Sequence, residues 1–240
     1  MPIVDEAVKR ILGMIDIKEE LYNCHKYSEQ GIVFTNRTEE IIRNMRPHPE
    51  VVLGEGEEVL GCYMPMASPG RILIYWQNIG SCFWHTVLQL NRKGYYMDYK
   101  DIERIAYLFV LKTYIHEQFH HLCDVSRYLF SSKYDRDVEE ALAVAWSYLK
   151  LSELRIQWNS KIAMIYTPMY REIVDLIFRY SSPGYREWVS YQTESKFASG
   201  IVRYLGPKTS FYLESNGIDV AQIIIGIHKN LGNVLEYLKP

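Results

Sequence analysis

Two histidines and a glutamate form the segment of this chain best suited to chemistry, His116-Glu117-Gln118-Phe119-His120. Residues four apart lie one above the other on a helix, so both imidazoles can reach the same cation. Glu117 directly follows the first histidine, which places its carboxylate where a general base can accept a proton from water that the ion activates. The pattern predicts a zinc site with His116 and His120 as ligands and Glu117 as the base. This prediction requires a helix and a third ligand.

The sequence around these residues has the pattern of one long helix. Residues 102–130 contain no Pro and no Gly, Asp101 is placed to cap the helix, and Glu103 adds negative charge to its first turn. Apolar residues recur at three- and four-residue spacing: Ile105, Leu108, Leu111, Ile115, Phe119, Leu122 and Leu129. The two histidines share a different stripe with Thr113 and Arg127. We therefore expect a helix that packs on one side and lines a cleft with the other.

A second helix pattern could supply the third ligand. It begins near Asp135 and has an acidic first turn, which stabilises a helix N-terminus. Glu139 and Glu140 follow His120 by 19 and 20 residues. A helix that returns after a turn over 131–133 can bring either carboxylate back over the histidines. The spacing alone leaves the choice between the two glutamates open.

This arrangement resembles the gluzincin metallopeptidases, which take their third zinc ligand from a Glu on the following helix. The run Glu140-Ala-Leu-Ala-Val-Ala is also similar to the Glu-Ala-x-x-x-Ala element of the ImmA/IrrE-type metallopeptidases. The resemblance covers about residues 70–146 and implies Glu140 as the ligand and Glu139 as a solvated neighbour. Thermolysin-like enzymes carry an Asp four residues after the ligand Glu. That position is Val144 here, so the thermolysin branch is disfavoured.

The resemblance implies a zinc-dependent metallopeptidase that hydrolyses peptide bonds. Zinc would be held by His116, His120 and Glu140, with Glu117 as the general base and a protein or peptide as the substrate. Such sites also need a donor that stabilises the oxyanion. The candidates for this donor are Tyr134, Tyr166 and His228.

Several alternatives compete with a catalytic zinc site. The histidines could be hydrogen-bonded core residues, in a helical partner-binding module without metal. A fourth protein ligand, His121 or Asp137, would give a catalytically silent structural zinc site. Otherwise His121 is expected at the rim or behind a ligand, and Asp124 is either solvated or orients an imidazole. A di-iron site could use Glu117 and His120, but it needs a second Glu-x-x-His, which the sequence lacks.

Composition and charge indicate an ordinary globular protein. The 240 residues are 48% hydrophobic and 23% charged, with a net charge of −2, which gives no basis for a nucleic-acid partner. The widely spaced Cys24, Cys62, Cys82 and Cys123 indicate neither a Cys-rich zinc site nor a disulfide framework. The first residues have no basic region followed by an apolar stretch, which argues against a secretory signal, and no apolar run approaches the roughly 20 residues that a membrane span needs. We expect a cytoplasmic protein without a membrane or nucleic-acid partner, and a regulatory protein partner is possible.

The remaining pattern predicts an α+β fold dominated by helix and zincin-like in kind. A small N-terminal sheet would precede the metal-binding helix and a helical C-terminal part. Within a single catalytic domain, 1–98 would form a mixed α/β lobe and 99–240 the helical lobe that carries the metal site. Residues 59–64 and 71–76 suggest a hairpin, in which Arg71–Trp76 is either a peptide-binding edge strand or an interior strand. Other predicted elements are a strand over 31–35 and helices over 3–30, 38–45, 149–158, 160–180, 184–204 and 217–237.

Overall fold

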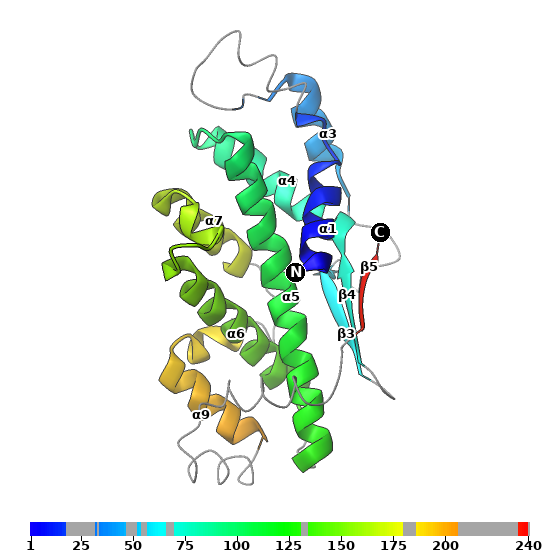
Figure 1. Cartoon of the computed structure of the whole chain (residues 1–240), viewed down its shortest axis with the longest axis vertical. Helices are drawn as coiled ribbons and strands as arrows, with labels where there is room; N and C mark the ends of the chain where they lie inside the picture. The colour runs from blue at the N-terminus through cyan, green and yellow to red at the C-terminus, as the bar shows by residue number, and fades with distance from the viewer. Residues whose placement is uncertain are drawn as a thin grey trace.

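The computed structural model describes residues 1–17, 32, 34–46, 52–53, 57–65, 70–130, 134–179, 186–205 and 235–239. Helices form most of this part and a small sheet lies beside them, so the predicted helix-dominated α+β class is confirmed. Helix α5, Tyr99–Phe130, runs through the middle of the molecule (Figure 1). On one side of it lie α6 (Arg136–Ile156) and α7 (Thr167–Arg179), and on the other lie the sheet and α1 (Pro2–Leu12). The described helices include none with an apolar stretch long enough to cross a membrane.

Helix α5 begins one turn earlier than its pattern predicted. The backbone N–H of Asp101 donates to Oδ1 of Asp98 at 2.7 Å, and the N–H of Asp98 donates to Oδ2 of Asp101 at 3.3 Å. This reciprocal pair is a capping box, in which Asp98 is the cap and Asp101 lies in the first turn. The predicted cap at Asp101 is therefore wrong by three residues. The helix itself is continuous through both histidines, as the motif requires.

Helix α6, Arg136–Ile156, is the partner of α5 that the metal-site prediction needs. Its cap is Asp135, whose side chain accepts a hydrogen bond from the N–H of Val138 at 3.2 Å. The helix has no break near residue 149, so the separate segment predicted over 149–158 is the end of α6. Between α5 and α6 the rings of Phe119 and Trp146 lie 6.2 Å apart, and Phe197 of α9 stacks on Trp146 at 5.5 Å.

The other helices pack around this pair. Helix α4, Trp76–Arg92, was not predicted, and it buries Phe83 and Trp84 fully. The Trp84 indole donates to the backbone carbonyl of Ile11 at 3.0 Å, which ties α4 to α1. The remaining described helices are α1 (Pro2–Leu12), α3 (Asn36–Asn44), the 3₁₀ turn η2 (Ile162–Met164), α7 (Thr167–Arg179), η3 (Glu187–Tyr191) and α9 (Glu194–Leu205).

Several sequence predictions change at the ends of these elements. The helix predicted over 3–30 ends at Leu12, before Gly13, and residues 18–30 lie outside the described part. Within 31–35 the described residues form no strand, and Thr35 instead caps α3 through its side chain. The segments predicted over 160–180 and 184–204 each divide into a 3₁₀ turn and an α-helix.

The sheet has three strands in the order β3-β4-β5. Strands β3 (Gly61–Met64) and β4 (Arg71–Tyr75) form the predicted antiparallel hairpin, with Gly61 opposite Ile74. Strand β5 (Leu235–Lys239) pairs parallel to the other side of β4. Among the described strands β4 is therefore central and β3 is an edge, so of the two alternatives for Arg71–Trp76 the interior strand is confirmed for residues 71–75 and the edge strand is wrong. A separate pair joins β1 (Val52–Leu53) to β2 (Glu57–Glu58).

Strand β5 also corrects the predicted position of the sheet. The helix predicted over 217–237 is contradicted at residues 235–237, and residues 217–234 lie outside the described part. The sheet is thus completed by a segment from the far end of the chain, drawn red in Figure 1, and is not wholly N-terminal. One cluster of buried apolar side chains crosses the predicted boundary at residue 98. It includes Ile3, Ile79, Ile105, Leu142, Ile173 and Ile201.

Candidate metal centre

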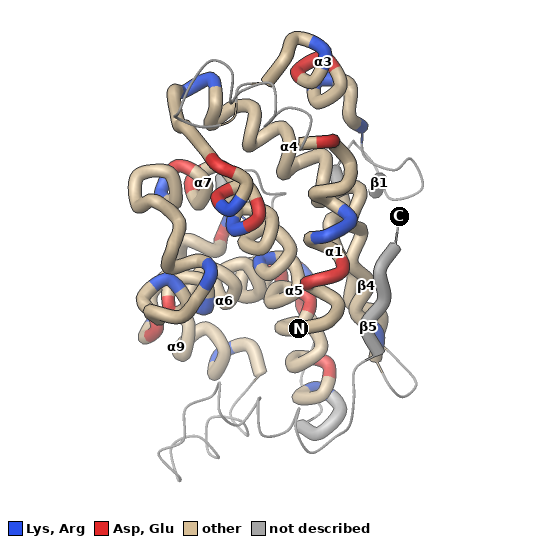
Figure 2. Tube along the Cα trace, turned by 45° about the horizontal axis from the view of Figure 1, so that its top comes forward, with Lys and Arg blue, Asp and Glu red and all other residues tan. Residues whose placement is uncertain are grey.

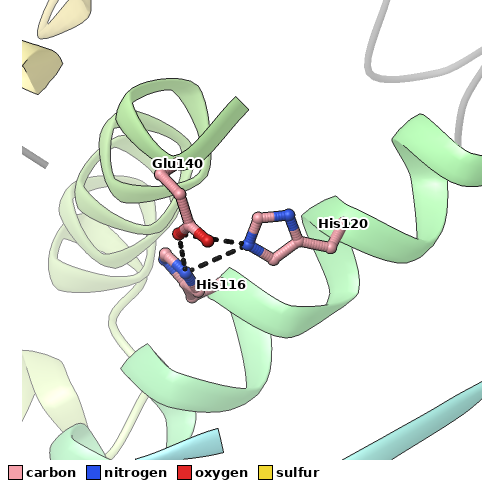
Figure 3. Close-up of side chains that lie close together, drawn as sticks. All are labelled: His116, His120 and Glu140. Atoms are coloured by element: carbon pink, nitrogen blue, oxygen red, sulfur yellow. Dashed lines mark hydrogen bonds and ion pairs between the residues drawn. The ribbon is translucent and has the colours of Figure 1, made fainter. Parts of the chain in front are cut away.

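Helix α5 directs His116 and His120 to the same point in space. Their rings are 4.9 Å apart, and their Nε2 atoms are separated by 3.2 Å (Figure 3). The i,i+4 spacing on an uninterrupted helix produces this arrangement. The predicted convergence of the two imidazoles is present in the structure.

Helix α6 brings Glu140 to the same point. Its Oε2 lies 3.1 Å from Nε2 of His116 and 3.4 Å from Nε2 of His120. Ligands at about 2.0–2.1 Å from one tetrahedral ion lie roughly 3.3–3.4 Å from one another. The three observed separations match this spacing closely. His116, His120 and Glu140 therefore form a group that could hold a metal ion.

The group is largely buried, and two of its three side chains keep some exposure to solvent. His116 is 5% exposed, while the side chains of His120 and Glu140 are 13% and 19% exposed. Among the described residues the cluster contains these three ligands and no fourth one. Asp137, a candidate fourth ligand of a structural site, is exposed on the first turn of α6 and lies outside the cluster.

Glu139 lies behind His120 and is not the solvated neighbour that the resemblance implied. Its side chain is 3% exposed, and its Oε1 lies 2.9 Å from Nδ1 of His120. Its Oε2 accepts hydrogen bonds from the Arg127 guanidinium and from the hydroxyl of Tyr204 on α9. These donors outweigh the effect of burial, so the pKa of Glu139 is lowered.

The electrostatics of the cluster favour a positive charge between the two Nε2 atoms and Glu140. Burial lowers the pKa of His116 to about 4. Burial also disfavours a charged His120, but its hydrogen bonds to Glu139 and Glu140 outweigh burial and raise its pKa to about 10. Burial would raise the pKa of Glu140, yet hydrogen bonds to both histidines lower it. Glu140 is thus an ionised carboxylate that faces the Nε2 atoms of both histidines.

Glu117 occupies a buried position between α5 and β3. A Cβ added to Gly61 would lie 2.9 Å from Glu117 Cγ and 3.0 Å from its Oε1, so only glycine leaves room for this carboxylate. Burial raises the pKa of Glu117 to about 7, although His120 and Lys112 lower it and a hydrogen bond from the Tyr63 backbone does the same. The carboxylate is therefore a stronger base than that of an ordinary glutamate, which suits a general base.

Lys112 adds a cation one helical turn before His116. Burial lowers its pKa, and the charges of Glu117 and Glu140 act in the opposite direction. Its Nζ lies 5.8 Å from the centre of the Phe178 ring on α7. The carboxylates of the site are thus partly balanced by a charge that the motif does not contain.

His121 turns away from the cluster, toward β3. Its Nδ1 lies 3.3 Å from the hydroxyl of Tyr63, which donates to Oδ2 of Asp124 at 2.9 Å. Asp124 therefore contacts a tyrosine and not a metal-facing imidazole. Arg127 lies 3.5 Å from the other Asp124 oxygen, so these residues connect β3 to the Arg127–Glu139 pair.

The three candidates for the oxyanion donor have different outcomes. Tyr134 precedes α6, is 62% exposed and lies under the Arg127 guanidinium at 5.0 Å. Burial, and then the charges of Glu139 and Glu140, raise the pKa of Tyr134. Tyr134 therefore lies near the cluster. Tyr166 is 64% exposed, and its carbonyl accepts a hydrogen bond from Tyr170 of α7. His228 lies outside the described residues.

Three contributors to the site have little signal in the sequence. Gly61 lies within a predicted strand, where glycine often marks a close approach of another group. Arg127 lies on the histidine stripe of α5, and Tyr204 is 65 residues from Glu139 without any motif. With this geometry established, comparison with protein-family models, with curated proteins and with solved structures finds no match for the chain.

Proposed function

We propose that this protein is a zinc-dependent metallopeptidase. The observation that carries the proposal is the convergence of His116 Nε2, His120 Nε2 and Glu140 Oε2 at mutual distances of 3.1–3.4 Å. Two imidazoles and one carboxylate are a ligand set typical of catalytic zinc. A structural zinc site needs four protein ligands, and the described residues offer three. The geometry therefore favours a catalytic site over a silent one.

The residues around this group can divide the work of hydrolysis. Zinc would supply Lewis-acid activation of a water molecule and of the substrate carbonyl. Glu117, beside the ligands, would accept the proton from the attacking water and deliver it to the leaving amine. Lys112 would offset the negative charge of the two carboxylates. His116 and His120 would offer their Nε2 atoms to the ion, and His120, whose pKa is raised to about 10, would release its Nε2 proton when the ion binds.

Strand β3 is the element best placed to position a peptide. It is an edge of the sheet within the described residues, and it runs against α5 at Glu117. An extended peptide can add to such an edge through backbone hydrogen bonds. The zincin-like character of the fold, the cytoplasmic location and a regulatory protein partner stay predictions that accompany this proposal. In Figure 2 Lys and Arg are mixed with Asp and Glu over the described helices. This mixed distribution gives no reason to expect a strongly charged substrate.

The test compares the full-length protein with its Glu117→Gln variant. Gln keeps the size of the side chain and its ability to accept the Tyr63 hydrogen bond, but it is not a base. A matched control is Glu103→Gln on the same helix, since Glu103 is 37% exposed and pairs with Lys161 at 3.1 Å. Each zinc-loaded protein is incubated with a proteome-derived peptide mixture, and new N-termini are identified by mass spectrometry.

We expect one bound zinc in all three proteins. Cleavage by Glu117→Gln should fall about 10²–10⁴-fold, while Glu103→Gln should cleave at the native rate. Cleavage at the native rate by Glu117→Gln would contradict the assigned mechanism. Full zinc occupancy without any cleavage by the native protein would contradict the peptidase and favour a silent metal site.

A further inference from the structure

Glu139 has more polar contacts than a neighbour of a ligand requires. One carboxylate oxygen faces Nδ1 of His120, and the other is shared by the Arg127 guanidinium and the Tyr204 hydroxyl. The three donors come from two helices, α5 and α9, while Glu139 belongs to α6. The side chain is 3% exposed, and a carboxylate so buried is costly unless such donors surround it.

We propose that Glu139 is a positioning residue for the metal centre, clamped by Arg127 and Tyr204, and that helix α9 thereby controls how tightly His120 binds the ion. The inference rests on the proposed metal centre. It adds a role for residues that neither the motif nor the ligand set contains.

The chemistry of the His120 ring explains how Glu139 acts. An ionised carboxylate only accepts hydrogen bonds, so Nδ1 of His120 must carry the proton. A neutral imidazole with its proton on Nδ1 presents a lone pair at Nε2, which is the atom that faces His116 and Glu140. The contact also fixes the rotation of the ring and makes the nitrogen a better ligand.

The second half of the clamp fixes Glu139 itself. Arg127 Nη1 lies 3.2 Å from the Tyr204 hydroxyl, so the two donors also contact each other. Arg127 is 17% exposed and reaches Asp124 at 3.5 Å. Tyr204 lies at the end of α9, the helix whose Phe197 stacks on Trp146 of α6. A shift of α9 would remove the hydroxyl from Glu139 and loosen the carboxylate that holds His120.

The experiment measures zinc affinity by competition with a chromogenic chelator and records the absorption spectrum of the cobalt-substituted protein. The variants are Glu139→Ala, Tyr204→Phe and the double variant. Two matched controls make the same kinds of change elsewhere. Glu153→Ala alters a glutamate of α6 that pairs with Lys150 at 2.7 Å, and Tyr170→Phe alters a half-buried tyrosine of α7. Circular dichroism and thermal unfolding monitor the fold of each.

We expect Glu139→Ala to bind zinc about 10–100-fold more weakly, as is typical when the outer partner of a ligand is lost. Tyr204→Phe should weaken binding by less, and its effect should vanish in the Glu139→Ala background because it acts through that carboxylate. The cobalt bands should shift in both single variants and in neither control. Should Glu139→Ala fail to fold, Tyr204→Phe, which removes one hydroxyl, carries the test alone.

The outcomes separate this inference from the metal centre on which it rests. A native protein that binds no zinc would overturn both. Native zinc binding with unchanged affinity and cobalt spectrum in the folded Glu139 and Tyr204 variants would overturn the positioning role alone. Equal losses from Tyr204→Phe in the presence and absence of Glu139 would show that Tyr204 acts independently, which would overturn the clamp.

Discussion

Glu139 and Glu140 are neighbours on α6, yet they contact opposite sides of one imidazole. Glu140 Oε2 lies 3.4 Å from Nε2 of His120, and Glu139 Oε1 lies 2.9 Å from its Nδ1. Adjacent residues on a helix point about 100° apart, so both carboxylates can reach His120 only from its two sides. The two glutamates that the spacing could not separate therefore have different roles in the proposed metal centre, one as a ligand and one as the support of a ligand.

This relationship predicts the order of damage from two alanine substitutions. Glu140→Ala removes a ligand atom and should reduce zinc affinity well beyond the about 10–100-fold expected for loss of an outer partner in Glu139→Ala. Chelator competition on the purified variants measures the difference. His121→Ala is the control, since His121 faces Tyr63 and should retain native affinity. A larger loss from Glu139→Ala would show that the two assignments must be exchanged.

The histidines give a second prediction about the metal. The protein should contain about one zinc per chain, and His116→Ala or His120→Ala should lose it, because each leaves a single imidazole and one carboxylate. Elemental analysis after gel filtration provides the measurement. His85→Ala on α4 is a matched control, because the His85 Nδ1 contacts the Ser81 carbonyl at 2.7 Å outside the cluster. Undiminished zinc in both ligand variants would exclude this site.

The capping box of α5 predicts a change in stability without a change at the metal. Asp98→Ala removes the acceptor for the Asp101 N–H and should lower the free energy of unfolding by about 1 kcal/mol. For a domain of this size the melting temperature should fall by roughly 2–4 °C. Asp175→Ala, an exposed position on α7, should change stability by no more than about 0.5 kcal/mol. Denaturant unfolding checks both, and zinc content should stay native in each.

Much of the metal centre could be predicted because its ligands follow local rules. The spacing of His116 and His120 depends only on helix geometry, and the acidic start of α6 is visible in the sequence. The supporting residues could not be predicted in the same way. Tyr204 reaches Glu139 from 65 residues away, and nothing local encodes that contact. The burial of Glu139 also depends on the packing of α9, which the sequence pattern does not specify.

The same division holds for the fold. Helices α5 and α6 and the β3–β4 hairpin were predicted because periodicity and turn residues mark them. Whether β4 is an edge or an interior strand could not be decided from the sequence, because its partner β5 comes from residues 235–239, far along the chain. Helix α4 was missed although it is strongly buried, since Trp76 continues the apolar strand that ends at Tyr75. The position of β4 in the sheet and the composition of the sheet both depend on the pairing of β4 with β5, which is distant in the sequence.

The close approach of β3 to α5 gives the last prediction. In Gly61→Ala the new Cβ would lie 2.8 Å from Thr113 Cγ2 and 2.9 Å from Glu117 Cγ, so β3 or the Glu117 side chain must move. We expect a destabilisation of about 1–3 kcal/mol from overpacking. Hydrolysis should fall as well, because the base is displaced, while zinc content should stay native since Glu117 is not a ligand.

Two further variants separate these effects. Gly94 has φ of 85° with open space around its Cβ position, so Gly94→Ala should cost about 1–2 kcal/mol through backbone strain and leave hydrolysis unchanged. Adding Thr113→Ser to Gly61→Ala removes the nearest methyl group but keeps a hydroxyl that can donate to the Phe109 carbonyl, as Thr113 does at 3.1 Å. The pair should recover part of the lost stability because the closest contact is gone. Native stability and a native cleavage rate in Gly61→Ala itself would show that β3 does not hold Glu117 in place.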